Sequence, residues 1–139
     1  MLQKALVVND NEILLMIAGR VIKIANFAQE TVSVTDGMQA LSFFDALIEN
    51  NETEQAPEFI FLDLHMPVMD GWDFLEEFTN NYADKFPKTR IAILSASVDR
   101  ADVILLDKYP IVIDFIATPI TEAALISIEH KYSSILQAC

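Results

Sequence analysis

The stretch FIFLDLHMPVMDG, residues 59–71, decides the fold class of this chain. It opens with four apolar residues and reaches Asp63, and the proline and glycine that follow prevent the strand from continuing. A short apolar run bounded by such breakers is typical of a strand buried on both faces of a sheet. Ligands of open parallel sheets bind just beyond the carboxyl ends of the strands. Asp63 is therefore a candidate site residue, although acids at strand ends also commonly cap turns.

Four more segments predict the rest of the sheet. The short apolar runs 5–8, 91–94 and 115–117 resemble the run at 59–62, whereas 31–35 alternates polar and apolar residues as an edge strand does. Helical patterns separate these five segments. Strands that alternate with helices predict an α/β fold, here a doubly wound five-stranded parallel sheet with helices on both faces.

Five amphipathic segments supply the predicted helices. They cover residues 12–26, 36–47, 72–80, 99–108 and 121–137. The spacing of apolar residues predicts the inward face of the first helix. This face consists of Leu14, Ile17, Val21 and Ala25. Trp72 follows the Asp-Gly turn and is expected to pack at the start of the third helix.

Length and charge limit the possible functions. With 139 residues, the chain is expected to form one domain, residues 1–139, without a separate output domain. Its net charge of −12 argues against nucleic acid or an anionic membrane as a partner, and is compatible with divalent cations or a basic protein surface. One cysteine, no signal peptide and no membrane-length apolar stretch predict a cytoplasmic protein.

A second acid stands at the end of the first predicted strand, at Asp10. If that strand lies beside the third, Asp10 and Asp63 meet at the switch point of the sheet. Two carboxylates, a backbone carbonyl and waters suit octahedral Mg²⁺. The fourth strand ends in Ser95 and the fifth in Thr118 and Pro119, so small polar groups from four strands converge on one place.

Residues 62–71 closely resemble the phosphoacceptor loop of response-regulator receiver domains in two-component signalling, and the resemblance extends along essentially the whole chain. It implies a flavodoxin-like strand order, 2-1-3-4-5, as in chemotaxis regulators. It also implies that Asp63 accepts a phosphoryl group from a histidine kinase or phosphotransfer protein. Asp10 and the backbone carbonyl of His65 then correspond to Mg²⁺ ligands.

The same resemblance assigns further roles around the site. Ser95 matches the hydroxyl residue that moves toward the phosphoryl group, and Phe115 matches the aromatic residue that swings inward with it. His65 and Ser97 flank the path of hydrolytic water and could tune the lifetime of the phosphoryl group. The peptide bond before Pro119 corresponds to one that is usually cis.

Two positions depart from the family pattern. Asn9 replaces the first member of a pair that is usually acidic, and Thr118 replaces a lysine that contacts the acceptor carboxylate. Losing one carboxylate and one ammonium together leaves the formal charge of the pocket unchanged. We therefore expect Mg²⁺ binding to persist, with Asn9 reaching the ion through water. The missing cation is expected to slow phosphorylation or weaken its coupling to shape change.

With no output domain expected, the output is predicted to be protein–protein contact. In the family, this message is carried by the surface of the fourth helix, fifth strand and fifth helix. The run Tyr109–Ile113, which leads into the fifth strand, is unusually apolar. Any part of it left exposed would mark a partner contact or a homodimer contact.

Two other classes of protein remain as alternatives. A pseudo-receiver would bind partners without phosphorylation, and the replacement of the lysine by Thr118 favours it. The acids Asp10 and Asp63, together with Ser95 and Phe115, argue against it. A dehalogenase-like phosphatase would need a second acid two residues after the nucleophile, where this chain has His65. The chain is therefore not expected to be an enzyme.

Overall fold

Five parallel strands form one sheet in the order β2-β1-β3-β4-β5. The computed structural model describes residues 2–66, 68–95, 104 and 107–138. In chain order the strands are β1 (Leu2–Val8), β2 (Ala28–Val34), β3 (Phe59–Asp63), β4 (Arg90–Ser95) and β5 (Val112–Ala117). The predicted fold class, the strand order and the edge position of β2 are confirmed.

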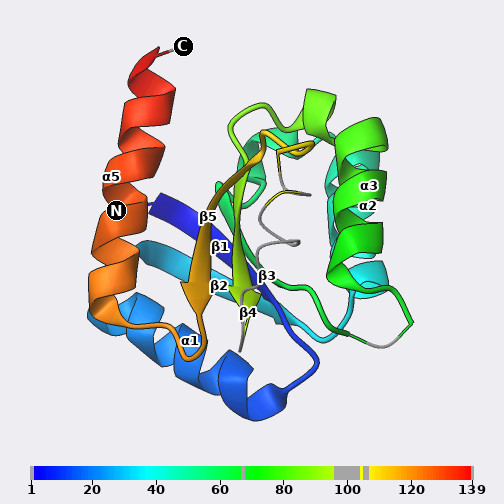
Figure 1. Ribbon diagram of the computed structural model, residues 1–139. Helices are drawn as coiled ribbons and strands as arrows, with labels where there is room; N and C mark the ends of the chain where they lie inside the picture. The colour runs from blue at the N-terminus through cyan, green and yellow to red at the C-terminus, as the bar shows by residue number, and fades with distance from the viewer. Residues whose placement is uncertain (1, 67, 96–103, 105–106, 139) are drawn as a thin grey trace.

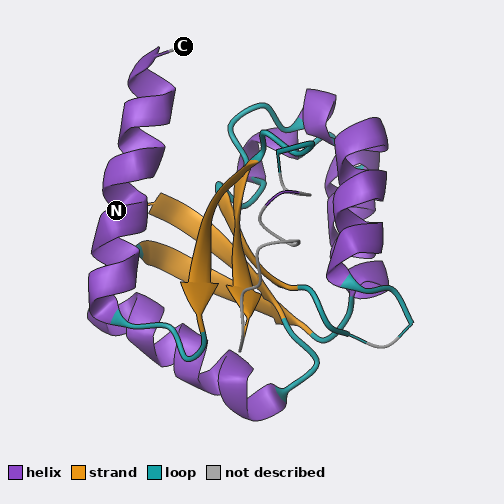
Figure 2. Ribbon diagram, viewed as in Figure 1, coloured by secondary structure: helices purple, strands orange, loops and turns teal. Residues whose placement is uncertain are grey.

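Helices cover both faces of this sheet (Figure 1). One face carries α1 (Glu12–Ile24) and α5 (Glu122–Ala138), and the other carries α2 (Gly37–Glu49) and α3 (Gly71–Asn81). Two short 3-10 helices, η1 (Thr53–Gln55) and η2 (Ala83–Lys85), lie in connections. Figure 2 shows the resulting three layers. No helix among the described residues is long and apolar enough to cross a bilayer.

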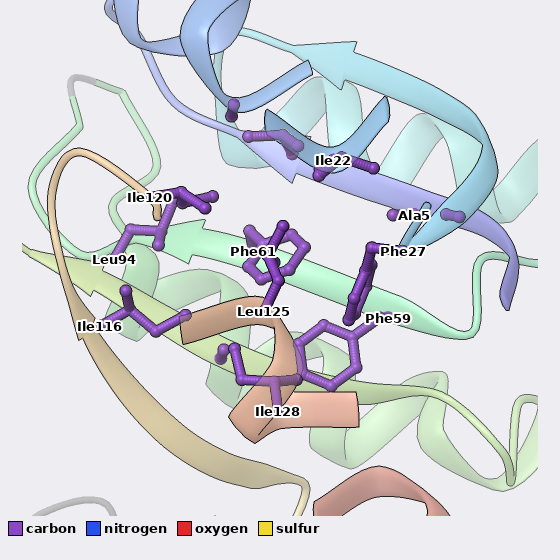
Figure 3. Packing of buried hydrophobic residues seen from close by; sticks show 14 of the residues in the cluster. Ala5, Ile22, Phe27, Phe59, Phe61, Leu94, Ile116, Ile120, Leu125 and Ile128 are labelled. Atoms are coloured by element: carbon purple, nitrogen blue, oxygen red, sulfur yellow. The ribbon is translucent and has the colours of Figure 1, made fainter. Parts of the chain in front are cut away.

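The central strand β3 supplies the core on both faces of the sheet. Phe59 and Phe61 belong to the cluster under α1 and α5, whereas Ile60 and Leu62 belong to the cluster under α2 and α3. All four side chains are fully buried, because successive residues of a strand point to opposite faces. Figure 3 shows both phenylalanines beside Phe27, with ring centroids 5.7 and 5.6 Å from it. Burial on both faces fixes the position of the strand and of the residue that ends it.

The predicted inward face of α1 is wrong by one residue position. The buried residues are Leu15, Ala18 and Ile22, and the predicted residues Leu14 and Ile17 are only partly buried. Apolar side chains surround most of this helix, so its sequence fits more than one register. Packing against both the sheet and α5 selects the register that is observed.

Several further segments differ from the sequence-based expectations. The strands β1, β2 and β5 each begin three residues before the predicted start, at Leu2, Ala28 and Val112. The apolar run Tyr109–Ile113 is mainly partly buried against the two core clusters, so it does not form a strongly exposed apolar patch. The helix predicted at residues 99–108 falls largely outside the described residues.

Candidate functional site

The carboxyl ends of the parallel strands bring the candidate site residues to one edge of the sheet. Val8 pairs with Leu62, so Asn9 and Asp63 follow at neighbouring strand ends. On the other side of β3, Asp63 itself pairs with Leu94, the residue before Ser95. The sheet therefore places the ends of β1, β3 and β4 side by side, as the sequence predicted.

Asp63 is a half-buried carboxylate with a raised pKa. Burial is the largest cause of the increase, and the negative charge of Asp10 adds to it. The backbone amide of His65, which donates a hydrogen bond to Oδ1 of Asp63 at 3.2 Å, acts in the opposite direction. The contribution of Asp10 to this increase indicates that the two predicted carboxylates lie near one another.

Gly71, the first residue of α3, packs directly on the end of β3. Its amide donates to the carbonyl oxygen of Leu64 at 3.0 Å. A Cβ atom at this position would lie 2.6 Å from the Asp63 carbonyl oxygen and 2.6 Å from the Leu64 Cα atom. Glycine is therefore required here for close backbone approach, and β3 and α3 form one packed unit.

Asn9 is the polar residue that replaces the usual acid, and it is almost completely buried at 2% exposure. Its Oδ1 atom accepts a hydrogen bond from the amide of Asn11 at 2.9 Å. Asn11 in turn caps α1, because its side chain accepts from the amides of Ile13 and Leu14. Asn9 thus orders the turn between β1 and α1.

The ends of β4 and β5 supply the other predicted residues. Ser95 is buried, and its carbonyl oxygen accepts the amide of Thr118 at 3.1 Å. Phe115 is partly buried against the cluster under α2 and α3. The bond between Thr118 and Pro119 is cis, the isomer that the family resemblance implies. Ser97, named with His65 as a residue that could tune the phosphoryl lifetime, lies outside the described residues.

The donor set at this edge suits a hard divalent cation. Asp10 and Asp63 supply carboxylates, the His65 carbonyl can supply a third oxygen, and Mg²⁺ prefers oxygen ligands with several waters retained. Within the described part of the chain, no group of three or more His, Cys, Asp or Glu side chains could hold a metal. A site here therefore depends on two carboxylates, a carbonyl and water.

Comparison with known families identifies the class of protein. The sequence profile of the response regulator receiver domain matches residues 5–128. This match covers most of the chain, which therefore belongs to the response regulator receiver domain family. No curated protein matches the sequence significantly.

Solved structures with the same fold include several response regulators. A two-component response regulator from Cytophaga hutchinsonii has a TM-score of 0.84 and 24% identity, covering 96% of this chain and 98% of its own. One from Legionella pneumophila has a TM-score of 0.75 and 24% identity, covering 95% and 98%. The chemotaxis response regulator CheY4 of Vibrio cholerae has a TM-score of 0.70 and 18% identity, covering 95% and 99%. At these identities the likeness establishes the fold alone.

The sequence did not predict the backbone conformation of the acceptor loop. Val68 has a φ of 69°, in the left-handed region, and its side chain is 88% exposed. A β-branched residue is uncommon there, so nothing in its identity pointed to this turn. The contact of Met69 with Gly37 was also missed: a Cβ on Gly37 would lie 2.8 Å from the Met69 side chain.

Replacing Gly71 with alanine is expected to destabilise the protein by about 1–3 kcal/mol, because the new methyl group meets backbone atoms that cannot rotate away. Gly19 provides a matched control, since it lies inside α1 with nothing within 4 Å of an added Cβ. Gly19→Ala should stabilise the protein by about 0.5–1 kcal/mol. Urea denaturation would measure both, and a Gly71→Ala variant as stable as the wild type would contradict the close packing.

Asp63→Asn is expected to raise the thermal midpoint at neutral pH, because folding no longer buries a charged carboxylate. The pKa of Asp63 is higher in the folded state than in the unfolded state. The wild type therefore loses stability as the pH rises from the unfolded-state pKa through the folded-state pKa. The advantage of Asp63→Asn should therefore shrink as the pH falls through the raised pKa of Asp63.

Asp84→Asn is the control for this comparison, because it removes one negative charge at an exposed position of η2. It accounts for the general effect of reducing the net charge of −12. Equal increases in the thermal midpoint for Asp84→Asn and Asp63→Asn would show that the burial of Asp63 has no specific effect on stability.

Proposed function

We propose that this receiver domain accepts a phosphoryl group on Asp63 from a histidine kinase or phosphotransfer protein, with Mg²⁺ as cofactor, in the cytoplasm. The observation that carries the proposal is the half-buried Asp63 carboxylate at the end of the central strand, close enough to Asp10 for the charge of Asp10 to raise its pKa. Two carboxylates that repel one another are stabilised by a shared cation.

The proposed reaction is a direct transfer. A carboxylate oxygen of Asp63 attacks phosphorus, so that an O–P bond forms while the N–P bond of the phosphohistidine breaks and its electron pair returns to the imidazole. Asp10, Asp63 and the His65 carbonyl would hold Mg²⁺. The bound ion would neutralise the charge of the phosphoryl oxygens. The hydrogen bond from the His65 amide to Asp63 orients the carboxylate.

Ser95 and Phe115 provide the proposed response to phosphorylation. Ser95 is the last residue of β4, which pairs with β3 at Asp63. Phe115 lies in β5 and pairs with Ile93 of β4. A hydroxyl group at the end of β4 can donate a hydrogen bond to a phosphoryl oxygen. Movement of that strand end would then alter the packing of the partly buried Phe115, which changes the surface offered to partners.

The output is proposed to be protein–protein contact through the surface of the fourth helix, β5 and α5, with homodimerisation as one form of it. The fourth helix lies largely outside the described residues. The edge position of β5 supports this proposal, because an edge strand presents unpaired backbone groups. The alternative is a pseudo-receiver that binds its partner without phosphorylation. Thr118 is the observation that favours the alternative, since a hydroxyl replaces the cation that would hold the phosphoryl group.

Incubation with Mg²⁺ and acetyl phosphate tests the proposal most directly. Intact-mass spectrometry should show one added phosphoryl group on the wild type and none on Asp63→Asn. Removing Mg²⁺ with a chelator should also abolish the adduct, because the two carboxylates would then repel the incoming phosphoryl oxygens. If the wild type binds Mg²⁺ in calorimetry yet forms no adduct, the pseudo-receiver reading is correct.

Thr118→Lys is expected to accelerate phosphorylation about fivefold at saturating Mg²⁺. A charged donor contributes about 1 kcal/mol more than a neutral hydroxyl to holding the phosphoryl oxygens. Ser133→Lys, at an exposed position of α5, is the control for the added positive charge. Equal rates for the wild type and Thr118→Lys would show that the residue at this position does not limit transfer.

A further inference from the structure

Tyr109, in the connection that precedes β5, is attached to α3 at two points. Its hydroxyl group donates a hydrogen bond to Oε2 of Glu76 at 2.8 Å, and its ring centroid lies 6.3 Å from that of Trp72. The hydrogen bond to Glu76 raises the pKa of the Tyr109 phenol. Trp72 and Glu76 are four residues apart on the helix, so both contacts lie on one side of α3.

The N-terminal end of α3, where Trp72 lies, is packed against the end of β3 at Asp63. Trp72 directly follows Gly71, whose packing against the carbonyl of Asp63 and the Cα atom of Leu64 leaves no room for a methyl group. The amide of Gly71 is also bonded to the Leu64 carbonyl. The junction between the end of β3 and the start of α3 is therefore closely packed, with little free space between the two elements.

Tyr109 is equally well connected to the start of β5. Its carbonyl oxygen accepts the amide of Val112 at 2.9 Å, and the carbonyl of Ile111 accepts the amide of Ile91 at 2.9 Å. The side chains of Tyr109, Ile111 and Val112 pack, with Phe115, against the cluster under α2 and α3. A continuous series of packed contacts thus runs from Asp63 through α3 and Tyr109 into β5.

We propose that Tyr109 is a latch that couples the state of Asp63 to the start of β5 through α3. This inference rests on the proposed phosphorylation of Asp63, and the route differs from the one through Ser95. The latch joins two elements at a fixed spacing, so it opposes any displacement of Trp72 that follows phosphorylation. Coupling between two sites is reciprocal. Breaking the contacts of Tyr109 with α3 must therefore make phosphorylation of Asp63, or binding of a phosphoryl analogue, more favourable.

Tyr109→Phe removes the hydroxyl group and keeps the ring. We expect it to bind the phosphoryl analogue beryllofluoride, with Mg²⁺, about two- to tenfold more tightly than the wild type, the range that one net hydrogen bond provides. Calorimetry would measure the affinities. Trp72 is the sole tryptophan of the chain, so its emission reports the same contact. The emission should change when beryllofluoride binds to the wild type, and should change more in Tyr109→Phe, where the hydrogen bond to Glu76 no longer opposes the displacement of Trp72.

Tyr82→Phe is the matched control. The hydroxyl of Tyr82, which caps the far end of α3, donates to Oδ1 of Asp45 in α2 at 2.7 Å. The Tyr82→Phe variant therefore loses an equivalent tyrosine–carboxylate hydrogen bond that lies outside the series of contacts from Asp63 to β5. Its affinity for beryllofluoride should equal that of the wild type. Thermal midpoints establish that both variants are folded.

The outcomes separate the two proposals. Equal affinities for the wild type and Tyr109→Phe, or an equal increase in Tyr82→Phe, would overturn the latch while leaving phosphorylation of Asp63 intact. A wild type that binds neither beryllofluoride nor a phosphoryl group would overturn the proposed function, and the latch with it.

Discussion

Burial of β3 on both faces is the constraint on which the site depends. Four consecutive side chains of this strand are completely buried, two under each pair of helices, so the strand can neither rotate nor slide without exposing apolar surface. Asp63 is the first residue after them. Its half-burial, and the raised pKa that results, follow from its place at the boundary between the core and solvent.

The constraint extends from β3 into the loop that joins it to α3. Gly71 lies so close to the Asp63 carbonyl that α3 begins in contact with the strand end, and Met69 of the same loop packs on Gly37 at the start of α2. The loop is thus fixed to two helices over a short distance. Asp63 is therefore held in place by the packing of the loop that follows it.

The features that could be predicted from the sequence are those that depend on local pattern. The apolar run ending in Asp63 identified the central strand, and the alternation at residues 31–35 identified β2 as an edge. The positions of Asp10 and Asp63 at neighbouring strand ends followed from parallel topology. The electrostatic effect of Asp10 on Asp63 agrees with that placement.

Features that depend on tertiary packing could not be predicted. The buried face of α1 was ambiguous because apolar residues surround the helix, and only its contacts with α5 and the sheet decide it. The contact between Tyr109 and Glu76 joins residues 33 positions apart, which no local pattern reports. The left-handed backbone at Val68 contradicts the preference of its side chain, so the surrounding loop must impose it.

The burial of Asn9 has a consequence for how this chain can evolve. An aspartate at this position would place another negative charge, almost fully buried, beside Asp10 and Asp63. Such a charge is costly unless a cation compensates it, and Thr118 cannot do so. Mutation of Asn9 to an acid and of Thr118 to lysine would therefore be tolerated best as a pair.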